Sequence, residues 1–228
     1  MRVLIGYSAC PLTREAFEAQ GHEVWTCDQL PARGGQERHL QMDIWDALML
    51  YAWDFAVLHP MCTMLTVSAA WAFEDPDFDR FPGVGYHQRV KPGTLTGAAR
   101  RAAREVELAN FQNLLDLPFP VGTENPGRSF ISTAIRPADQ IIHPYMFGDD
   151  ASKATGLWLT RGTPKLIPTR HIAPRMVNGL PRWANQTDSG QNNLSPSPDR
   201  WLERSKTYPG IAAAMGDQWG RWLNQRTA

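Results

Sequence analysis

Cysteine is scarce in this sequence, and no apolar run is long enough to cross a membrane. The 228 residues include three cysteines, Cys10, Cys27 and Cys62, and no CxxC pair. Such a set excludes a disulfide framework and paired-cysteine zinc sites, so we expect a protein of the reducing cytoplasm with no metal site and no membrane segment. The first apolar run breaks at Gly6, too early for a signal peptide, so we expect Met1 to begin the folded domain.

The chain also has no excess of charge of one sign. Lys and Arg together number 23, as do Asp and Glu, so the formal net charge is zero. This balance argues against a protein that coats polyanions with its whole surface, although a basic patch could still bind phosphates locally.

Short apolar runs alternate with amphipathic segments along the first two thirds of the chain. Buried strands are expected at 2–5, 22–28, 40–42, 53–58 and 120–125, and helices at 12–20, 44–51 and 98–115. Two more short strands, with a turn around 149–152, indicate a hairpin. Strands that alternate with helices predict a doubly wound, mostly parallel, Rossmann-like α/β sheet.

In two stretches the apolar residues follow no regular period. Residues 74–97 are rich in Pro, Gly and aromatic residues and are expected to form a long functional loop. The stretch that follows position 164 is dense in Pro, Asn, Arg and Gly. We therefore expect a catalytic core over 1–164, a small irregular lobe over 165–205, and a C-terminal helix within 206–228 that packs back on the core.

Chemically reactive side chains follow several of the predicted strands. Asp28, Asp43 and Cys62 lie at carboxyl ends, where ligands of such sheets collect. Glu124, in TENP, lies at the end of another strand. If the strands before Cys62 and Glu124 are neighbours, the thiol and the carboxyl face each other across a pocket for one heterocycle. A packed cysteine and a solvated glutamate are the simpler alternatives for each residue alone.

Several segments, in order along nearly the whole chain, resemble the cytosine-C5 DNA methyltransferases in their compact phage and prophage form. They are GYSACPLTREAFEAQGHEVWTCD, MDIWD, HPMCTMLTVS, TENPGRSFIS, RPADQIIHPYMFGDDASKATGLWL, NQTDSGQNNLSPS and ERSKTYPGIAAAMGDQWG. Two positions differ from the family pattern: YSACPLT replaces a glycine-rich turn, and Met61 replaces the proline before the nucleophile.

The resemblance implies a covalent mechanism. Because C5 of cytosine is a weak nucleophile, a thiolate first adds to C6 and converts the ring into an enamine, and Cys62 resembles that nucleophile. Glu124 resembles the acid that acts at N3, a role that suits a carboxyl whose pKa is raised by burial. Asn125 and Pro126 would hold the carboxyl and the shape of the loop.

The resemblance also implies S-adenosylmethionine as the methyl donor, bound at the rim of the first three strands. The expected contacts are Tyr7, Ser8, Ala9, Asp28, Asp43, Ile44 and Pro60. Asp28 would accept hydrogen bonds from the ribose, and Asp43 with Ile44 would meet the adenine. Each aspartate is equally compatible with a helix cap or a turn.

The expected partner is DNA, bound as a duplex with its target base flipped out. Substrate contacts implied by the resemblance are Thr63, Pro126, Arg128, Arg136 and Arg204. In the lobe, the side chains of the kind that read base edges and phosphates are Asn185, Gln186, Gln191 and Arg200. If the protein is phage-encoded, it would act in the host cytoplasm.

Three other functions are compatible with the sequence. The first is the same chemistry on a free pyrimidine nucleotide, and the second is a non-catalytic nucleic-acid binder derived from a methyltransferase. The third is a cysteine hydrolase that pairs Cys62 with His59 or His87, for which no orienting third group is evident. The target sequence and the oligomeric state stay open.

Overall fold

A single mixed sheet forms the centre of the computed structural model, which describes residues 1–33, 37–74, 93–195, 197, 200, 204 and 206–226. Its seven strands lie in the order β3-β2-β1-β4-β5-β7-β6. They are β1 (Arg2–Gly6), β2 (Glu23–Asp28), β3 (His39–Gln41), β4 (Phe55–Leu58), β5 (Val121–Pro126), β6 (Gln140–Ile142) and β7 (Thr155–Leu159). The first five are parallel, and β7 is antiparallel to both β5 and β6. The predicted doubly wound, mostly parallel sheet and its hairpin are confirmed.

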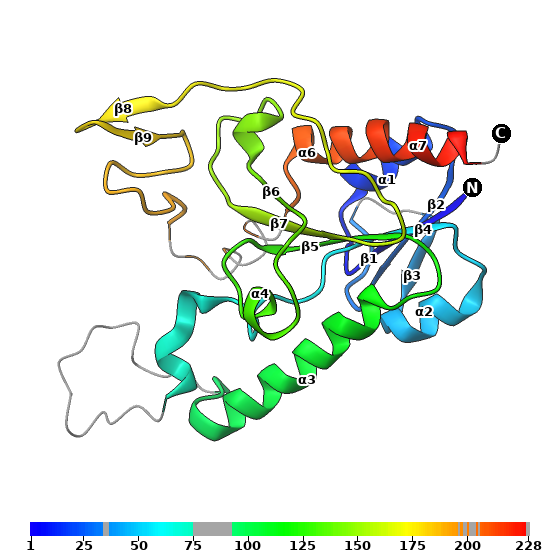
Figure 1. Ribbon diagram of the computed structural model, residues 1–228, viewed down its shortest axis with the longest axis horizontal. Coiled ribbons are helices and arrows are strands. Elements are labelled where there is room, and N and C mark those ends of the chain that lie inside the picture. The colour runs from blue at the N-terminus through cyan, green and yellow to red at the C-terminus, as the bar shows by residue number, and fades with distance from the viewer. Residues whose placement is uncertain are drawn as a thin grey trace.

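Helices cover both faces of this sheet (Figure 1). The α-helices are α1 (Pro11–Glu18), α2 (Ile44–Leu50), α3 (Gly97–Leu115), α4 (Ile131–Ala134), α6 (Pro209–Ala214) and α7 (Gly220–Gln225). A π-helical turn, η4 (Met215–Trp219), joins α6 to α7, and 3-10 turns span η1 (Val67–Phe73) and η3 (Pro144–Met146). One face carries α1, α6 and α7, and the other carries α2 and α3. None of the described helices is both long and apolar enough to cross a bilayer.

Alternate residues of the central strands supply two apolar layers. Val3 and Ile5 of β1 pack with α1 and the C-terminal helices, whereas Leu4 between them packs with α2 and α3. In the same way Val57 and Leu58 of β4 belong to opposite layers. Side chains that alternate between two covered faces require a continuous apolar run, which is the pattern seen in the sequence.

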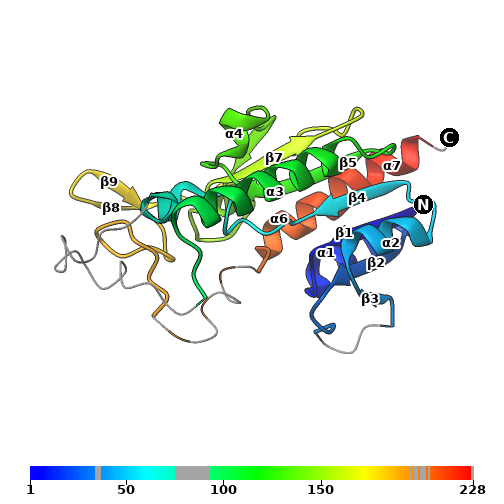
Figure 2. The ribbon, with the colours of Figure 1, turned by 90° about the horizontal axis from the view of Figure 1, so that it is seen from below.

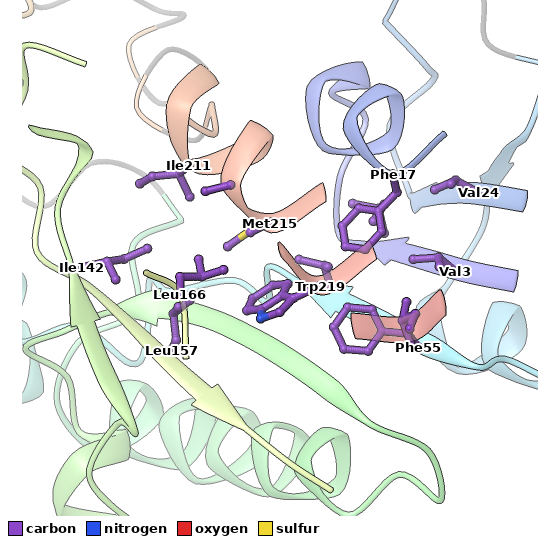
Figure 3. Packing of buried hydrophobic residues seen from close by; sticks show 14 of the residues in the cluster. Val3, Phe17, Val24, Phe55, Ile142, Leu157, Leu166, Ile211, Met215 and Trp219 are labelled. Carbon is purple, nitrogen blue, oxygen red and sulfur yellow. The ribbon is translucent and has the colours of Figure 1, made fainter. Parts of the chain in front are cut away.

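Trp219 fixes the C-terminal helix on β5. The side chain is fully buried, and its Nε1 donates to the Pro164 carbonyl at 2.8 Å. A Cβ atom on Gly122 of β5 would lie 2.8 Å from the Trp219 ring, so only glycine lets the indole lie this close to the strand. Figure 3 shows Trp219 between Leu157 and Phe55. The helix thereby packs directly on the strand that carries Glu124.

The lobe is less irregular than predicted, because it contains the hairpin β8 (Arg175–Val177) and β9 (Leu180–Arg182). Asn178 and Gly179 between these strands have φ values of 49° and 75°. Positive φ at both turn residues is the type I′ geometry that Asn-Gly favours. Most of the predicted long loop, 74–97, lies outside the described residues.

Replacement of Trp219 by alanine is expected to lower the free energy of unfolding by about 3–5 kcal/mol, since it removes a fully buried indole and leaves a cavity. Met49 is 86% exposed on α2, and Met49→Ala is the matched control, with an expected change within about 0.5 kcal/mol. Chemical denaturation measures both, and equal midpoints for the two variants would contradict the packing described for Trp219.

Candidate active site

The strand order reverses between β1 and β4, because β1 pairs with β2 on one side and with β4 on the other. In doubly wound sheets the ligand crevice opens outside the carboxyl ends of the strands at this point. Segment 7–10 leaves β1 there, and segment 59–62 leaves β4. β5 is the neighbour of β4, which meets the condition set by the sequence analysis, and Leu58 pairs with Thr123, so Glu124 lies just beyond the end of β4.

The carboxylate of Glu124 contacts two basic side chains. His59 Nδ1 lies 2.7 Å from Oε2 and Lys153 Nζ lies 3.9 Å from Oε1, while the His59 and Glu124 side chains are only 12% and 16% exposed. Burial favours the neutral acid and acts to raise the pKa of Glu124, but Lys153 and the His59 hydrogen bond outweigh it and lower that pKa to about 2. The predicted upward shift is therefore wrong, and Glu124 is ionised at neutral pH.

Cys62 is exposed at the start of a tight turn. Its carbonyl accepts hydrogen bonds from the amides of Leu65 and Thr66 at 3.0 and 2.9 Å. Desolvation of the sulfur raises the pKa of the thiol; among the charged neighbours, Lys153 and Arg204 lower it and Glu124 raises it. The residue is thus exposed while its sulfur is partly desolvated, and the nearby cations offset only part of the rise in the pKa of the thiol.

Two hydrogen bonds hold the loop that carries Cys62. Asn125 is 2% exposed, and its Nδ2 donates to the Pro60 carbonyl at 2.9 Å. Arg100 Nη2 donates to the carbonyl of the exposed Thr63 at 3.0 Å. Asn125 thus holds the loop shape, as predicted, while Pro126 ends β5 opposite the first residue of β7.

The turn after β1 contains a residue with positive φ, although it has no glycine beyond Gly6. Tyr7 has φ 57°, in the left-handed region that non-glycine residues rarely adopt. The amide of the buried Ser8 donates to the Cys27 carbonyl at 2.9 Å, and Ala9, also buried, follows it. Strained backbone of this kind concentrates at functional sites.

Asp28 and Asp43 each use one carboxylate oxygen for a local turn. Oδ1 of Asp28 accepts from the Leu30 amide at 2.9 Å, and Oδ1 of Asp43 accepts from the amide of residue 45 at 2.9 Å and caps α2. The second oxygen of each has no hydrogen bond to any residue that the structure describes. Ile44 is 3% exposed and packs beneath Gly6, so its side chain belongs to the core rather than to the rim.

The residues predicted to contact phosphates and bases lie in different parts of the structure and differ in exposure. Arg204 is exposed and its charge acts on the Cys62 thiol. Arg128 is exposed just beyond β5. In the lobe, Gln191 is exposed and Arg200 is half-buried.

Arg136 is not part of the site. Its guanidinium donates to Asp139 at 2.7 Å and to the Leu159 carbonyl at 3.1 Å. Leu159 pairs with Gly122 near the amino end of β5, at the opposite edge of the sheet from the Cys62 loop. These two bonds hold the Arg136 guanidinium within the fold, and its contact with a substrate stays a prediction.

The amides of Asn185 and Gln186 are engaged inside the protein. Asn185 accepts from the Ser152 amide at 2.9 Å and donates to the Ser152 carbonyl at 3.0 Å. Gln186 accepts from the Trp183 amide at 3.2 Å and donates to the Gly190 carbonyl at 3.4 Å. Contrary to the prediction, these side chains hold the lobe together and are not free to read bases.

His59 and Lys153 are the site residues that the sequence analysis did not assign to the methyltransferase site. His59 follows the apolar run of β4 directly, and its place at a strand end was the signal available. Lys153 precedes β7, and an antiparallel β7 begins beside the carboxyl end of β5. Only the direction of that strand brings the lysine to Glu124.

The geometry does not favour a cysteine hydrolase. Glu124 supplies the orienting group for His59 that the sequence did not reveal. However, Nε2 of His59 is buried without a hydrogen-bond partner among the described residues, so no contact links the imidazole to the Cys62 thiol. His87 lies outside the described residues. Within the described part of the chain, no three His, Cys, Asp or Glu side chains gather as metal ligands.

Replacement of Lys153 by methionine is expected to raise the pKa of the Cys62 thiol further, because a cation that favours the thiolate is lost. Alkylation of Cys62 by iodoacetamide, followed by peptide mass spectrometry, should then reach half its maximal rate at a higher pH. Lys165→Met removes an exposed lysine of the lobe and is the control. An unchanged pH midpoint in Lys153→Met would show that Lys153 does not act on the thiol.

No family model matches this chain, and no curated protein matches it either. What the protein does is therefore inferred from the residues of this site.

Proposed function

We propose that this protein transfers a methyl group from S-adenosylmethionine to C5 of cytosine in DNA. One observation carries the proposal. The exposed residue Cys62 follows β4, and the hydrogen-bonded carboxylate of Glu124 lies on the adjacent strand β5, beside the point where the strand order reverses. Two such groups at adjacent strand ends suit a flat ring that is attacked on one atom and held at another.

The roles of the two groups follow from their chemistry. The Cys62 thiolate forms a bond to C6, and the electron pair released from the C5–C6 double bond makes C5 nucleophilic. Glu124 faces N3, where a proton must arrive to neutralise the charge that develops. After the methyl group is bonded to C5, a water molecule takes the C5 proton, the C–H electron pair re-forms the C5–C6 double bond, and the C6–S bond breaks to release the Cys62 thiolate. The cation of Lys153 favours the thiolate that begins this sequence.

The carboxyl ends of β1, β2 and β3 offer groups that fit the methyl donor. The left-handed turn at Tyr7 brings the backbone close to the rim, and Asp28 and Asp43 each keep an acceptor oxygen for ribose hydroxyls or an amine. When bound, S-adenosylmethionine supplies the electrophilic methyl group.

The distribution of charge favours DNA as the substrate. Residues 151–187 contain no Asp or Glu, and their basic residues are Lys153, Arg161, Lys165, Arg170, Arg175 and Arg182. Asp149, Asp150 and Asp188 flank this segment, and Asp188 pairs with Arg175 at 2.6 Å. The hairpin of β8 and β9 in this segment extends from the body of the protein at the end opposite α7 (Figure 2). Met176 and Leu180 on it are 63% and 53% exposed. A two-stranded ribbon fits the DNA major groove, where apolar side chains can contact thymine methyl groups.

Incubation with DNA and methyl-labelled S-adenosylmethionine is expected to label cytosine with the wild type and not with Cys62→Ala. DNA that contains 5-fluorocytosine should trap a covalent adduct, because fluorine cannot leave C5 as a proton. Peptide mapping should place the adduct on Cys62, with Cys10 and Cys27 as internal controls. Equal labelling by the variant, or an adduct on another cysteine, would refute the assigned nucleophile. Labelling of dCMP but not of DNA would show that the substrate is a free nucleotide.

Charge removal from the lobe should weaken DNA binding in a salt-dependent way. For Lys165→Gln with Arg170→Gln we expect lower affinity, and a slope of log K against log salt that is smaller by about 0.9 for each lost phosphate contact. The matched control is Arg221→Gln with Arg226→Gln, two exposed positions in the C-terminal helical segment. Fluorescence anisotropy at several salt concentrations measures both, and identical slopes would exclude the lobe as the DNA-binding face.

A further inference from the structure

A buried arginine contacts the loop that carries Cys62. Arg100, in the first turn of α3, is 4% exposed. Its Nη2 donates to the Thr63 carbonyl at 3.0 Å, and its Nη1 donates to the Leu95 carbonyl at 3.3 Å. Its Cζ lies 4.8 Å from the centroid of the Phe73 ring. One guanidinium therefore contacts three segments, which are the Cys62 loop, the segment before α3, and η1.

Stability alone does not account for an arginine at this position. No described Asp or Glu pairs with the Arg100 cation, and its Nε is buried without a hydrogen-bond partner among the described residues. Removal of a charge from water costs free energy, and replacement of buried charges by apolar residues is often neutral or stabilising. The arginine is therefore better explained by what its hydrogen bonds hold in place.

Cys62 lies between two backbone carbonyls that are held from different elements. On its amino side, Asn125 of β5 donates to the Pro60 carbonyl at 2.9 Å. On its carboxyl side, Arg100 of α3 donates to the Thr63 carbonyl. The two donor residues are 2% and 4% exposed, so water hardly competes for either hydrogen bond. The backbone of the nucleophile is thus held on both sides.

The position of the guanidinium is set by the elements around it. Phe73 and Leu95, which contact Arg100, lie on either side of residues 75–92. The Gly97 amide donates to the Glu74 carbonyl at 3.1 Å and joins these two flanking segments to each other. The donor that Arg100 offers to the loop is therefore held in place independently of the loop itself.

We propose that Arg100 is a positioning residue, which holds the Thr63 carbonyl so that the sulfur of Cys62 meets C6 of the cytosine ring, a role that rests on the proposed methyl transfer. Bond formation requires the sulfur and C6 in a narrow range of distance and direction, and a displacement of about 1 Å can cost about 100-fold in rate. The charges that act on the Cys62 thiol are those of Lys153, Glu124 and Arg204. Arg100 thus acts on the geometry of the loop and not on ionisation of the thiol.

Arg100→Met removes both hydrogen bonds and keeps an unbranched side chain. We expect kcat for methyl transfer to fall about 100-fold, KM for DNA and for S-adenosylmethionine to change by less than about 3-fold, and the thermal midpoint to stay close to that of the wild type. Arg100→Lys keeps the charge and can reach one carbonyl, so it should restore part of the rate. It also carries the test if Arg100→Met does not fold.

Arg104→Met is the matched control. Arg104 lies one turn further along α3, with its Cζ 5.1 Å from the centroid of the Phe73 ring, and it donates to Glu105. It has no hydrogen bond to the Cys62 loop in the described part of the chain. Its replacement should leave kcat within about 2-fold of the wild type.

Alkylation separates positioning from a general defect at Cys62. Iodoacetamide reacts without an oriented complex, so Arg100→Met should be alkylated at Cys62 at least as fast as the wild type and with the same pH midpoint. Adduct formation with DNA that contains 5-fluorocytosine should instead slow about 100-fold. Slower alkylation in parallel with slower adduct formation, or a shifted pH midpoint, would overturn the positioning role.

Amide hydrogen exchange tests the same contact without any activity. The amides of Leu65 and Thr66 donate to the Cys62 carbonyl, and in Arg100→Met they should exchange at least about 10-fold faster, with no change in Arg104→Met. Wild-type protection or wild-type kcat in Arg100→Met overturns the proposal. If the wild type labels no DNA although this protection depends on Arg100, the methyl transfer is overturned and the hold on the loop is retained, so the two failures are distinct.

Discussion

The parallel pairing of β4 with β5 is the constraint on which the rest of the site depends. Because Leu58 pairs with Thr123, the next residues along the two strands, His59 and Glu124, are brought to hydrogen-bond distance. A shift of one residue in β5 would turn Glu124 to the other face of the sheet. That register is supported from behind by the close approach of Trp219 to Gly122, so the C-terminal helix contributes to the position of the carboxylate.

The balance between burial and neighbouring charges decides whether Glu124 is ionised. Burial alone would neutralise Glu124, and Lys153 and His59 reverse that preference. Lys153 also favours the thiolate of Cys62, so one cation influences both reactive groups in the same direction.

The sequence predicted the sheet well because its strands are buried on both faces and must be continuously apolar, a pattern visible without coordinates. It predicted the strand ends that carry the thiol and Glu124 for the same reason. The direction of the pKa shift of Glu124 was missed, since it depends on Lys153, which reaches the site only because β7 is antiparallel.

Some turns could be predicted from their own residues, and others are imposed by the surrounding fold. The Asn178–Gly179 turn is a strong hairpin signal that the analysis of the lobe overlooked, and better attention to turn chemistry would have found it. The left-handed Tyr7 is different, because tyrosine carries no preference for that region and only the surrounding fold imposes it. Nor could the sequence show that Arg136 would be bound at the far edge of the sheet.

The lobe and the reactive groups are mechanically connected. Asn185 clamps the backbone of Ser152 through both of its amide atoms, and the next residue is Lys153. Trp183, two positions earlier, stacks on Tyr145 with ring centroids 4.2 Å apart and an interplanar angle of 12°. These contacts fix the lobe to the segment that leads into β7. Because the cation that favours the thiolate extends from that same segment, displacement of the lobe by a bound ligand would act on the backbone that positions Lys153. The basic lobe and the ionisation of the Cys62 thiol are thus joined through a single stretch of chain.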